Sequence, residues 1–183
     1  MSVTMRDLGK RLGVSAVTIS KALAGKSGVS EEMRQRIISL ADELGYDYYL
    51  RHVSSAVVGL HPSIMGVGPI EASREALEKA GLTIEDIDLI ELNEAFAAQS
   101  VAVMREWAKW SDKETFDTIW ERTNVNGSGI SLGHPLAATG GILTTKLFYE
   151  LKNRPDVRYA MVTMCIGGGM GFASIFEQCR KEG

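Results

Sequence analysis

The sequence predicts an α/β chain, α+β overall, in which a small three-helix module precedes a layered α/β domain with a mixed five-stranded sheet. Residues 3–46 divide into three short helical patterns, and from about Leu50 apolar strand-like runs alternate with helices. A length of 183 residues allows one domain and a small module. We therefore expect domains at residues 1–47 and 50–183.

The composition gives no general sign of a nucleic-acid or membrane partner. Lys and Arg number 20 against 23 Asp and Glu, a net charge of -3. The polar start MSVTMRDLGKR carries no apolar segment behind it, and no apolar run reaches membrane length. With only two cysteines, Cys165 and Cys179, the chain is expected to be cytoplasmic, with free thiols and no membrane contact.

Three helices are predicted in the first module. Thr4, Ser15 and Ser30 stand where helix N-caps belong, and Gly13 suits a tight turn between the first two helices. The apolar residues at helical spacing, which could form one small core, are Leu8, Leu12, Val14, Ile19, Leu23, Ile37, Ala41 and Leu44. This is a helix-turn-helix pattern.

Charge is distributed unevenly in this module. Residues 6–26 carry five basic side chains and one acidic side chain, a local charge of +4. Such a face suits the phosphates of DNA, although small three-helix units with solvated basic faces also occur without binding anything. The pattern alone leaves both interpretations open.

The segment VSAVTISKALAGKSGVSEEMRQRIISLADELGY resembles the DNA-binding headpiece of the lac repressor (LacI) family, and the match extends over residues 3–47. The resemblance implies that the helix from Ser15 to about Ala24 enters the major groove of double-stranded DNA. Ala16 and Val17 would read bases through apolar contacts, and Lys21 would supply a base-edge donor. The phosphate or positioning contacts would come from Thr4, Ser15, Thr18 and Ser20.

After about residue 47 the resemblance to the LacI family ends. The segment DYYLRHVSSAVVGL lacks the family's hinge pattern, which inserts into the minor groove, and no sugar-binding-like core follows. One headpiece contacts one half-site and binds weakly. Useful affinity would therefore require the rest of the chain to pair two headpieces, so a homodimer is expected.

The rest of the chain predicts alternating strands and helices. In order, these are a strand at VSSAVVGL, a helix from Pro69 to before Gly81, a strand at DLIEL, a helix beginning near Asn93, a helix at SDKETFDTIWERT with a capping box from Ser111 to Glu114, a helix running to about Asn153, and strands at RYAMVTMC and FASIFEQC.

Four motifs in this region resemble the C-terminal half of a thiolase, an acetyl-CoA C-acyltransferase. They are GLHPSIMGVGPIEASREALEKAGL, NEAFAAQ, NVNGSGISLGHP and MCIGGGMG, and the similarity covers about residues 50–178. Ala137 stands where the family usually has glycine, and the connection from Trp110 to Thr123 is slightly long.

The thiolase resemblance implies a set of roles in the chemistry of acyl-CoA thioesters. Cys165 would be the acid/base thiol, and His134 would help to activate the nucleophile and donate to one oxyanion. Asn93 would hold a water in that oxyanion hole, and the Gly167 N–H would serve the other hole. Coenzyme A thioesters would be substrates or ligands; no cofactor is expected, nor a metal, since neither His52 nor His61 has a partner at metal-ligand spacing.

The acyl-carrying cysteine of thiolases belongs to their N-terminal half, in whose place this chain has the headpiece. The leading hypothesis is a sequence-specific DNA-binding protein, a transcriptional regulator, whose thiolase-like domain is inactive alone. A second is a thiolase component completed by a separate N-terminal half, and a third is a fusion without function. The helix LAATGGILTTKLFYEL is apolar or small nearly all round, which favours covering by a second copy of the chain.

Overall fold

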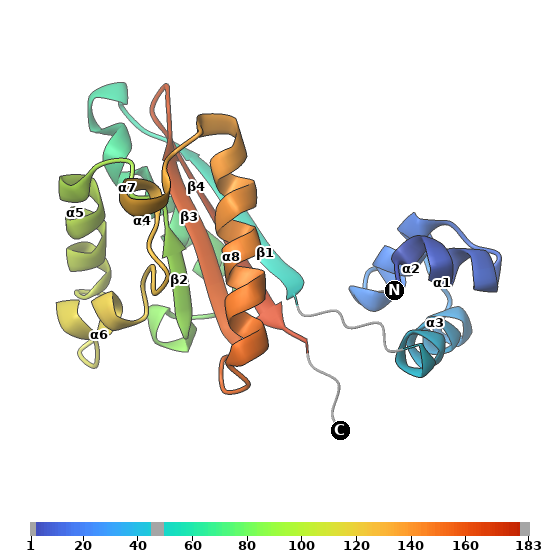
Figure 1. Ribbon diagram of the computed structural model, residues 1–183. Helices are drawn as coiled ribbons and strands as arrows, with labels where there is room; N and C mark the ends of the chain where they lie inside the picture. The colour runs from blue at the N-terminus through green and yellow to red at the C-terminus, as the bar shows by residue number, and fades with distance from the viewer. Residues whose placement is uncertain (1–2, 45–49, 180–183) are drawn as a thin grey trace. The chain divides into compact units, whose positions relative to one another are not determined.

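The computed structural model describes residues 3–44 and 50–179 (Figure 1). The chain folds as two compact units, one built on the residues up to Arg51 and the other spanning His52–Gln178. The boundary predicted between residues 47 and 50 falls largely outside the described residues and stays a prediction.

The first unit is a three-helix module, as predicted. Its helices are α1 (Met5–Leu12), α2 (Ala16–Leu23) and α3 (Glu31–Glu43). The side chains of Thr4, Ser15 and Ser30 each accept a hydrogen bond from the backbone N–H three residues further on, so all three predicted N-caps are present. The buried core consists of Leu8, Ile19, Ala22, Ile37 and Ala41.

Two glycines shape the turn between α1 and α2. Gly13 has a φ of 68°, in the left-handed region that glycine adopts without strain. Val14 N donates to Gly9 O at 3.0 Å, and a Cβ on Gly9 would lie only 2.6 Å from Val14 O. The helices can therefore approach this closely because Gly9 has no side chain.

Arg34 of α3 fixes the end of α2. Its two terminal nitrogens donate to Ala22 O and Lys26 O, each at 2.8 Å. Carbonyl groups at a helix C-terminus lack partners within the helix, and a cation there also favours the helix dipole. Arg34 thus holds the carboxyl end of α2 against α3.

The remaining elements build the second unit, apart from the first two residues of β1. In chain order they are β1 (Leu50–Gly59), η1 (Pro62–Val67), α4 (Gly68–Ala80), η2 (Ile84–Asp86), β2 (Leu89–Leu92), α5 (Ala97–Trp107), α6 (Phe116–Glu121), α7 (Gly129–Leu132), η3 (Leu136–Ala138), α8 (Thr139–Asn153), β3 (Tyr159–Ile166) and β4 (Met170–Gln178).

Four strands form one mixed sheet in the order β1-β4-β3-β2, with β2 parallel and β4 antiparallel to β3. The prediction of five strands was wrong by one. Thr123 makes a single parallel bridge to Ile90, and Asn124 then turns to a φ of 53°. Its side-chain amide accepts from Leu92 N and donates to Leu92 O, both at 2.8 Å, so this amide takes up backbone groups at the edge of β2.

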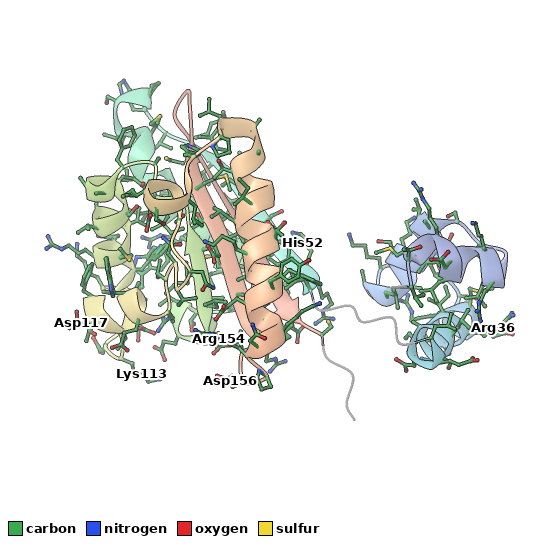
Figure 2. All side chains as sticks on the ribbon, viewed as in Figure 1. Arg36, His52, Lys113, Asp117, Arg154 and Asp156 are labelled. Atoms are coloured by element: carbon green, nitrogen blue, oxygen red, sulfur yellow. The ribbon has the colours of Figure 1, made fainter. Side chains whose placement is uncertain are left out.

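Helices cover both faces of the sheet. Ile90 and Leu92 lie in one core with residues of α4 and α5, whereas Glu91 between them bonds to Lys146 of α8. Since neighbouring side chains of a strand point to opposite faces, α8 lies across the other face, in front of the sheet in Figure 1. Side chains fill the space between the helices and the sheet (Figure 2).

Two predicted boundaries are corrected. The chain after β2 stays irregular through Phe96, and α5 begins at Ala97 rather than near Asn93, because Asn93 N still continues the strand pairing by donating to Thr163 O at 2.9 Å. The capping box predicted from Ser111 to Glu114 instead joins Thr115 and Thr118 at the start of α6.

Within the described residues, no helix combines the length and the apolar character that crossing a membrane requires.

Candidate functional site

The predicted DNA-reading residues lie on and around α2. Val17 is 64% exposed, and Ser20 and Lys21 are exposed beside it, one turn further along the helix. Ala16 is half-buried, while the opposite side of α2 packs into the core. The sequence therefore places an apolar side chain and a cation on one solvent-facing side of this helix.

The predicted phosphate-contacting hydroxyls begin the first two helices. Ser15 Oγ accepts from Thr18 N at 3.1 Å and lies 2.9 Å from Thr18 Oγ1. Thr4 caps α1, and its hydroxyl donates to Asp7 Oδ2 at 2.6 Å, which holds the pKa of the Asp7 carboxyl below its ordinary value. These hydroxyls stabilise the amino ends of α1 and α2, the ends that favour an anion.

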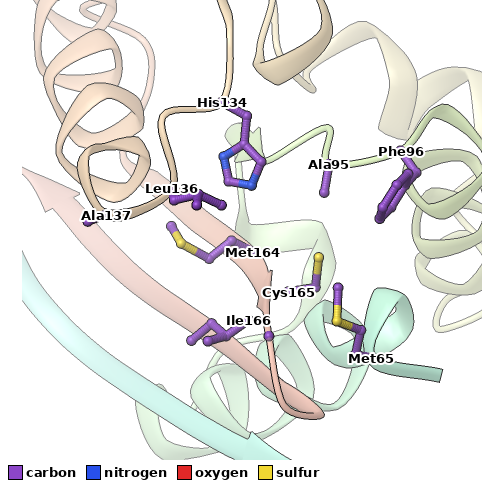
Figure 3. A pocket seen from close by; sticks show the side chains of 10 residues that line it. Met65, Ala95, Phe96, His134, Leu136, Ala137, Met164, Cys165 and Ile166 are labelled. Atoms are coloured by element: carbon purple, nitrogen blue, oxygen red, sulfur yellow. The ribbon is translucent and has the colours of Figure 1, made fainter. Parts of the chain in front are cut away.

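The second unit has a cavity of about 490 Å³ at the carboxyl end of β3 (Figure 3). Its wall is formed by Met65, Ala95, Phe96, His134, Leu136, Ala137, Met164, Cys165, Ile166 and Gly167. Most of these side chains are apolar. An apolar cavity with a few polar groups is typical of a small-molecule site.

Three of the four predicted catalytic residues, His134, Cys165 and Gly167, line this cavity, and the fourth touches one of them. His134 Nδ1 lies 2.7 Å from Thr139 Oγ1, and its Nε2 lies 3.3 Å from Asn93 Nδ2. Figure 3 shows His134 and Cys165 across the cavity from each other, with the Cys165 sulfur directed toward the histidine. The fold thus brings Asn93, His134 and Cys165, which are at least 31 residues apart in the sequence, to one site.

Cys165 is only 8% exposed, and burial raises the pKa of its thiol above the ordinary value. A thiol with a raised pKa keeps its proton at neutral pH, so it is suited to donate a proton rather than to attack as a thiolate. Cys179, by contrast, follows directly after β4 and does not line the cavity, and neither cysteine forms a disulfide bond.

Asn93 is fully buried, and its Oδ1 has no hydrogen-bond partner among the described residues. Gly129 lies against this oxygen, since a Cβ on Gly129 would come within 2.9 Å of it. A buried amide oxygen without a partner is costly unless a water or ligand reaches it. Asn93 therefore brings a buried amide acceptor, unpaired among the described residues, next to His134.

Glycines bring the turn after Cys165 close to the start of α4. Gly168 and Gly169 have φ angles of 91° and 89°, and Leu60 N donates to Gly169 O at 2.8 Å. Gly68 and Gly171 face each other so closely that neither could carry a side chain. Close backbone packing therefore accounts for glycine at positions 68, 169 and 171.

Two features near the site were not predicted from the sequence. Thr139 contacts His134, and the ion pair between Glu91 and Lys146 holds α8 to β2. Thr139 stands only five residues after His134, so this contact could have been considered from the sequence. Glu91 is a single polar residue in a short strand, and nothing in the sequence indicates its ion pair with Lys146.

The comparisons with known proteins agree with this geometry. The family model described as the thiolase C-terminal domain matches residues 47–178, more than half of the chain. The chain belongs to the thiolase family. The model for bacterial regulatory proteins of the lacI family matches residues 4–47, so the first unit is a LacI-type helix-turn-helix domain.

Relatives of the thiolase domain include well-matched bacterial enzymes. An acetyl-CoA acetyltransferase of Syntrophomonas wolfei subsp. wolfei is 53% identical over 137 residues, 75% of this chain and 33% of that protein. A 3-ketoacyl-CoA thiolase of Bacillus subtilis (strain 168) is 49% identical over 139 residues, 76% of this chain and 33% of that protein.

The crystal structure of the Bacillus anthracis acetyl-CoA acetyltransferase superposes with a TM-score of 0.66 at 42% identity, covering 82% of this chain and 34% of that one. The chain thus spans about a third of the length of the thiolases it matches. Within the described part of this thiolase-family chain, no group of three His, Cys, Asp or Glu side chains is placed to hold a metal ion.

Proposed function

We propose that this protein binds double-stranded DNA in a sequence-specific manner and regulates transcription, with the thiolase domain as its assembly module. The observation that carries the proposal is the exposed side of α2, where Val17 and Lys21 face solvent on a helix of LacI type. A helix-turn-helix domain places such a side in the major groove.

Two kinds of base contact are available to α2. Val17 and Ala16 offer only methyl groups, which suit the C5-methyl of thymine, and Lys21 can donate to the acceptors of guanine. Thr4, Ser15, Thr18 and Ser20 would position the module on the phosphates. Basic side chains between residues 6 and 26 supply the attraction to the DNA backbone.

A second copy of the chain is the partner that we propose for the thiolase domain. On α8 and the loop before it, Leu136 is 79% exposed, Ile142 37% and Tyr149 61%. Between Leu136 and Thr145 this surface, the α8 face, carries no charged side chain, so an identical surface can approach this part without like-charge repulsion, while Lys152 lies over the Tyr149 ring at its other end. A twofold axis there would pair two headpieces for a palindromic site.

Selection of bound duplexes from a random pool tests the DNA-binding proposal. We expect enrichment of a palindromic sequence by the unchanged protein and its loss in Lys21→Ala. Lys109→Ala is the matched control, since it removes the same charge from an exposed site on the thiolase domain. The proposal fails if the unchanged protein enriches no sequence at low or moderate salt.

The arrangement of Asn93, His134 and Cys165 favours a second candidate, a thiolase component acting on acyl-CoA thioesters once a separate N-terminal half supplies the acyl-carrying cysteine. Acetoacetyl-CoA cleavage would be assayed with a purified thiolase N-terminal half added. This candidate predicts activity that Cys165→Ala abolishes. No activity in the mixture and no enriched DNA sequence would together leave a fusion without function.

A further inference from the structure

Thr139 is the first residue of α8, and its side chain is 2% exposed. A threonine hydroxyl in a helix often donates to the carbonyl four residues earlier, as Thr144 does to Gly140 O at 2.8 Å. Thr139 instead places Oγ1 2.7 Å from His134 Nδ1, and no side chain in the described part of the protein caps α8. Its buried hydroxyl is therefore directed at the histidine, not at the helix.

The other nitrogen of His134 faces Asn93. An amide nitrogen only donates hydrogen bonds, so Asn93 Nδ2 at 3.3 Å requires Nε2 to accept. A neutral imidazole with an accepting Nε2 carries its proton on Nδ1. That proton then points to Thr139 Oγ1, which accepts it.

The segment around His134 offers little other restraint. All residues from Ser131 to Ala138 are exposed, and His134 lies in the short connection between α7 and η3. Free histidine in water prefers the proton on Nε2. The buried Oγ1 of Thr139 opposes that preference, because it accepts a proton on Nδ1 that would otherwise have no hydrogen-bond partner.

We propose that Thr139 is a positioning residue that fixes the ring of His134 and keeps its proton on Nδ1, so that Nε2 stays an acceptor. The ring of His134 is then oriented by residues of this chain, without a contribution from a separate N-terminal half. The proposal concerns the thiolase domain and does not depend on DNA binding.

The test is the ¹⁵N NMR signature of the imidazole in the full chain, because the two neutral tautomers give different nitrogen shifts. His134→Gln identifies the His134 signals among those of the three histidines. Spectra of Thr139→Val, Thr139→Ala and Thr139→Ser are compared at a pH where the ring is neutral. Thr144→Val is the matched control, since it removes a hydroxyl from the same helix away from His134.

We expect the unchanged protein, Thr139→Ser and Thr144→Val to hold the proton on Nδ1, and Thr139→Val and Thr139→Ala to shift it toward Nε2. Should Thr139→Val fail to fold, Thr139→Ala, which only removes atoms, provides the same comparison. Identical nitrogen shifts in the unchanged protein and in Thr139→Ala would overturn the proposal, as would a proton on Nε2 in the unchanged protein.

Discussion

Lys146 Nζ lies 2.7 Å from Glu91 Oε2, and this ion pair joins α8 to the buried strand β2. Glu91 is fully buried and Lys146 is 15% exposed at its side chain. Lys146 also donates to Gly127 O, in the loop that leads to His134. One cation therefore holds together a helix, a strand and the approach to the candidate site.

Removing the Lys146 cation should destabilise the thiolase domain. Lys146→Met leaves the Glu91 charge buried without its partner, which we expect to lower the free energy of unfolding by about 3–5 kcal/mol. The double variant Glu91→Leu/Lys146→Met should recover most of the loss. Urea unfolding followed by tryptophan fluorescence measures both, because Trp107, Trp110 and Trp120 all lie in the thiolase domain. Equal losses in the single and double variants would contradict this expectation.

The same carboxyl gives the thiolase domain a pH dependence. Burial raises the pKa of Glu91 above its ordinary value of 4.5, although the bond to Lys146 opposes this. The folded domain thus binds the proton more tightly than the unfolded chain, and between the two pKa values its free energy of unfolding falls as the pH rises.

Comparison with Glu91→Gln isolates this effect, since other carboxyl groups contribute equally to both proteins. The free energy of unfolding of the unchanged protein minus that of the variant should fall as the pH rises from about 4.5. Urea unfolding at a series of pH values gives the difference. A difference that stays level or increases would be inconsistent with a raised pKa.

Gly9→Ala should destabilise the headpiece. The added Cβ would lie 2.6 Å from the backbone oxygen of Val14, so the turn must open, at a cost of about 1–3 kcal/mol. Hydrogen exchange of the amides of α1, α2 and α3 should accelerate, while exchange in the thiolase domain stays unchanged. Lys10→Ala, at an exposed neighbouring position, is the control. Unaltered exchange in Gly9→Ala would show that the close approach is unimportant.

Much of the fold follows from sequence patterns. The caps at Thr4, Ser15 and Ser30, the helix ending at Asn153 and the strands beside the glycine turn were all predictable, because each depends on neighbouring residues. The number of strands was not, because no fifth strand pattern can be located in the sequence. At the edge of β2 the Asn124 side chain bonds to Leu92, 32 residues away in the sequence, which no local pattern indicates.

In the candidate site, too, the features carried by sequence motifs were predictable and those that depend on tertiary contacts were not. Motif resemblance pointed to Asn93, His134, Cys165 and Gly167, and the cavity brings three of them together with Asn93 behind His134. The partner of His134 in Thr139 and the ion pair of Glu91 depend on tertiary contacts. A short-strand glutamate gives no local sign that it will be buried.

Tyr149→Glu should weaken self-association through the α8 face at least tenfold, since a twofold axis would bring two carboxylates into an apolar contact. Val57→Glu is the matched control, because Val57 is 62% exposed on β1 and Tyr149 is 61% exposed on α8. Sedimentation equilibrium measures the dissociation constants. A dimer weakened by Val57→Glu and not by Tyr149→Glu would place the interface on β1 instead.

The central claim is that two copies, paired through their thiolase domains, read one palindromic DNA site. Sedimentation velocity of the protein with the duplex recovered by selection, and with a duplex carrying one half-site, tests it most directly. The account predicts two chains on the palindrome at saturation, in a complex that Tyr149→Glu weakens. A saturated complex of one chain per palindromic duplex would contradict it.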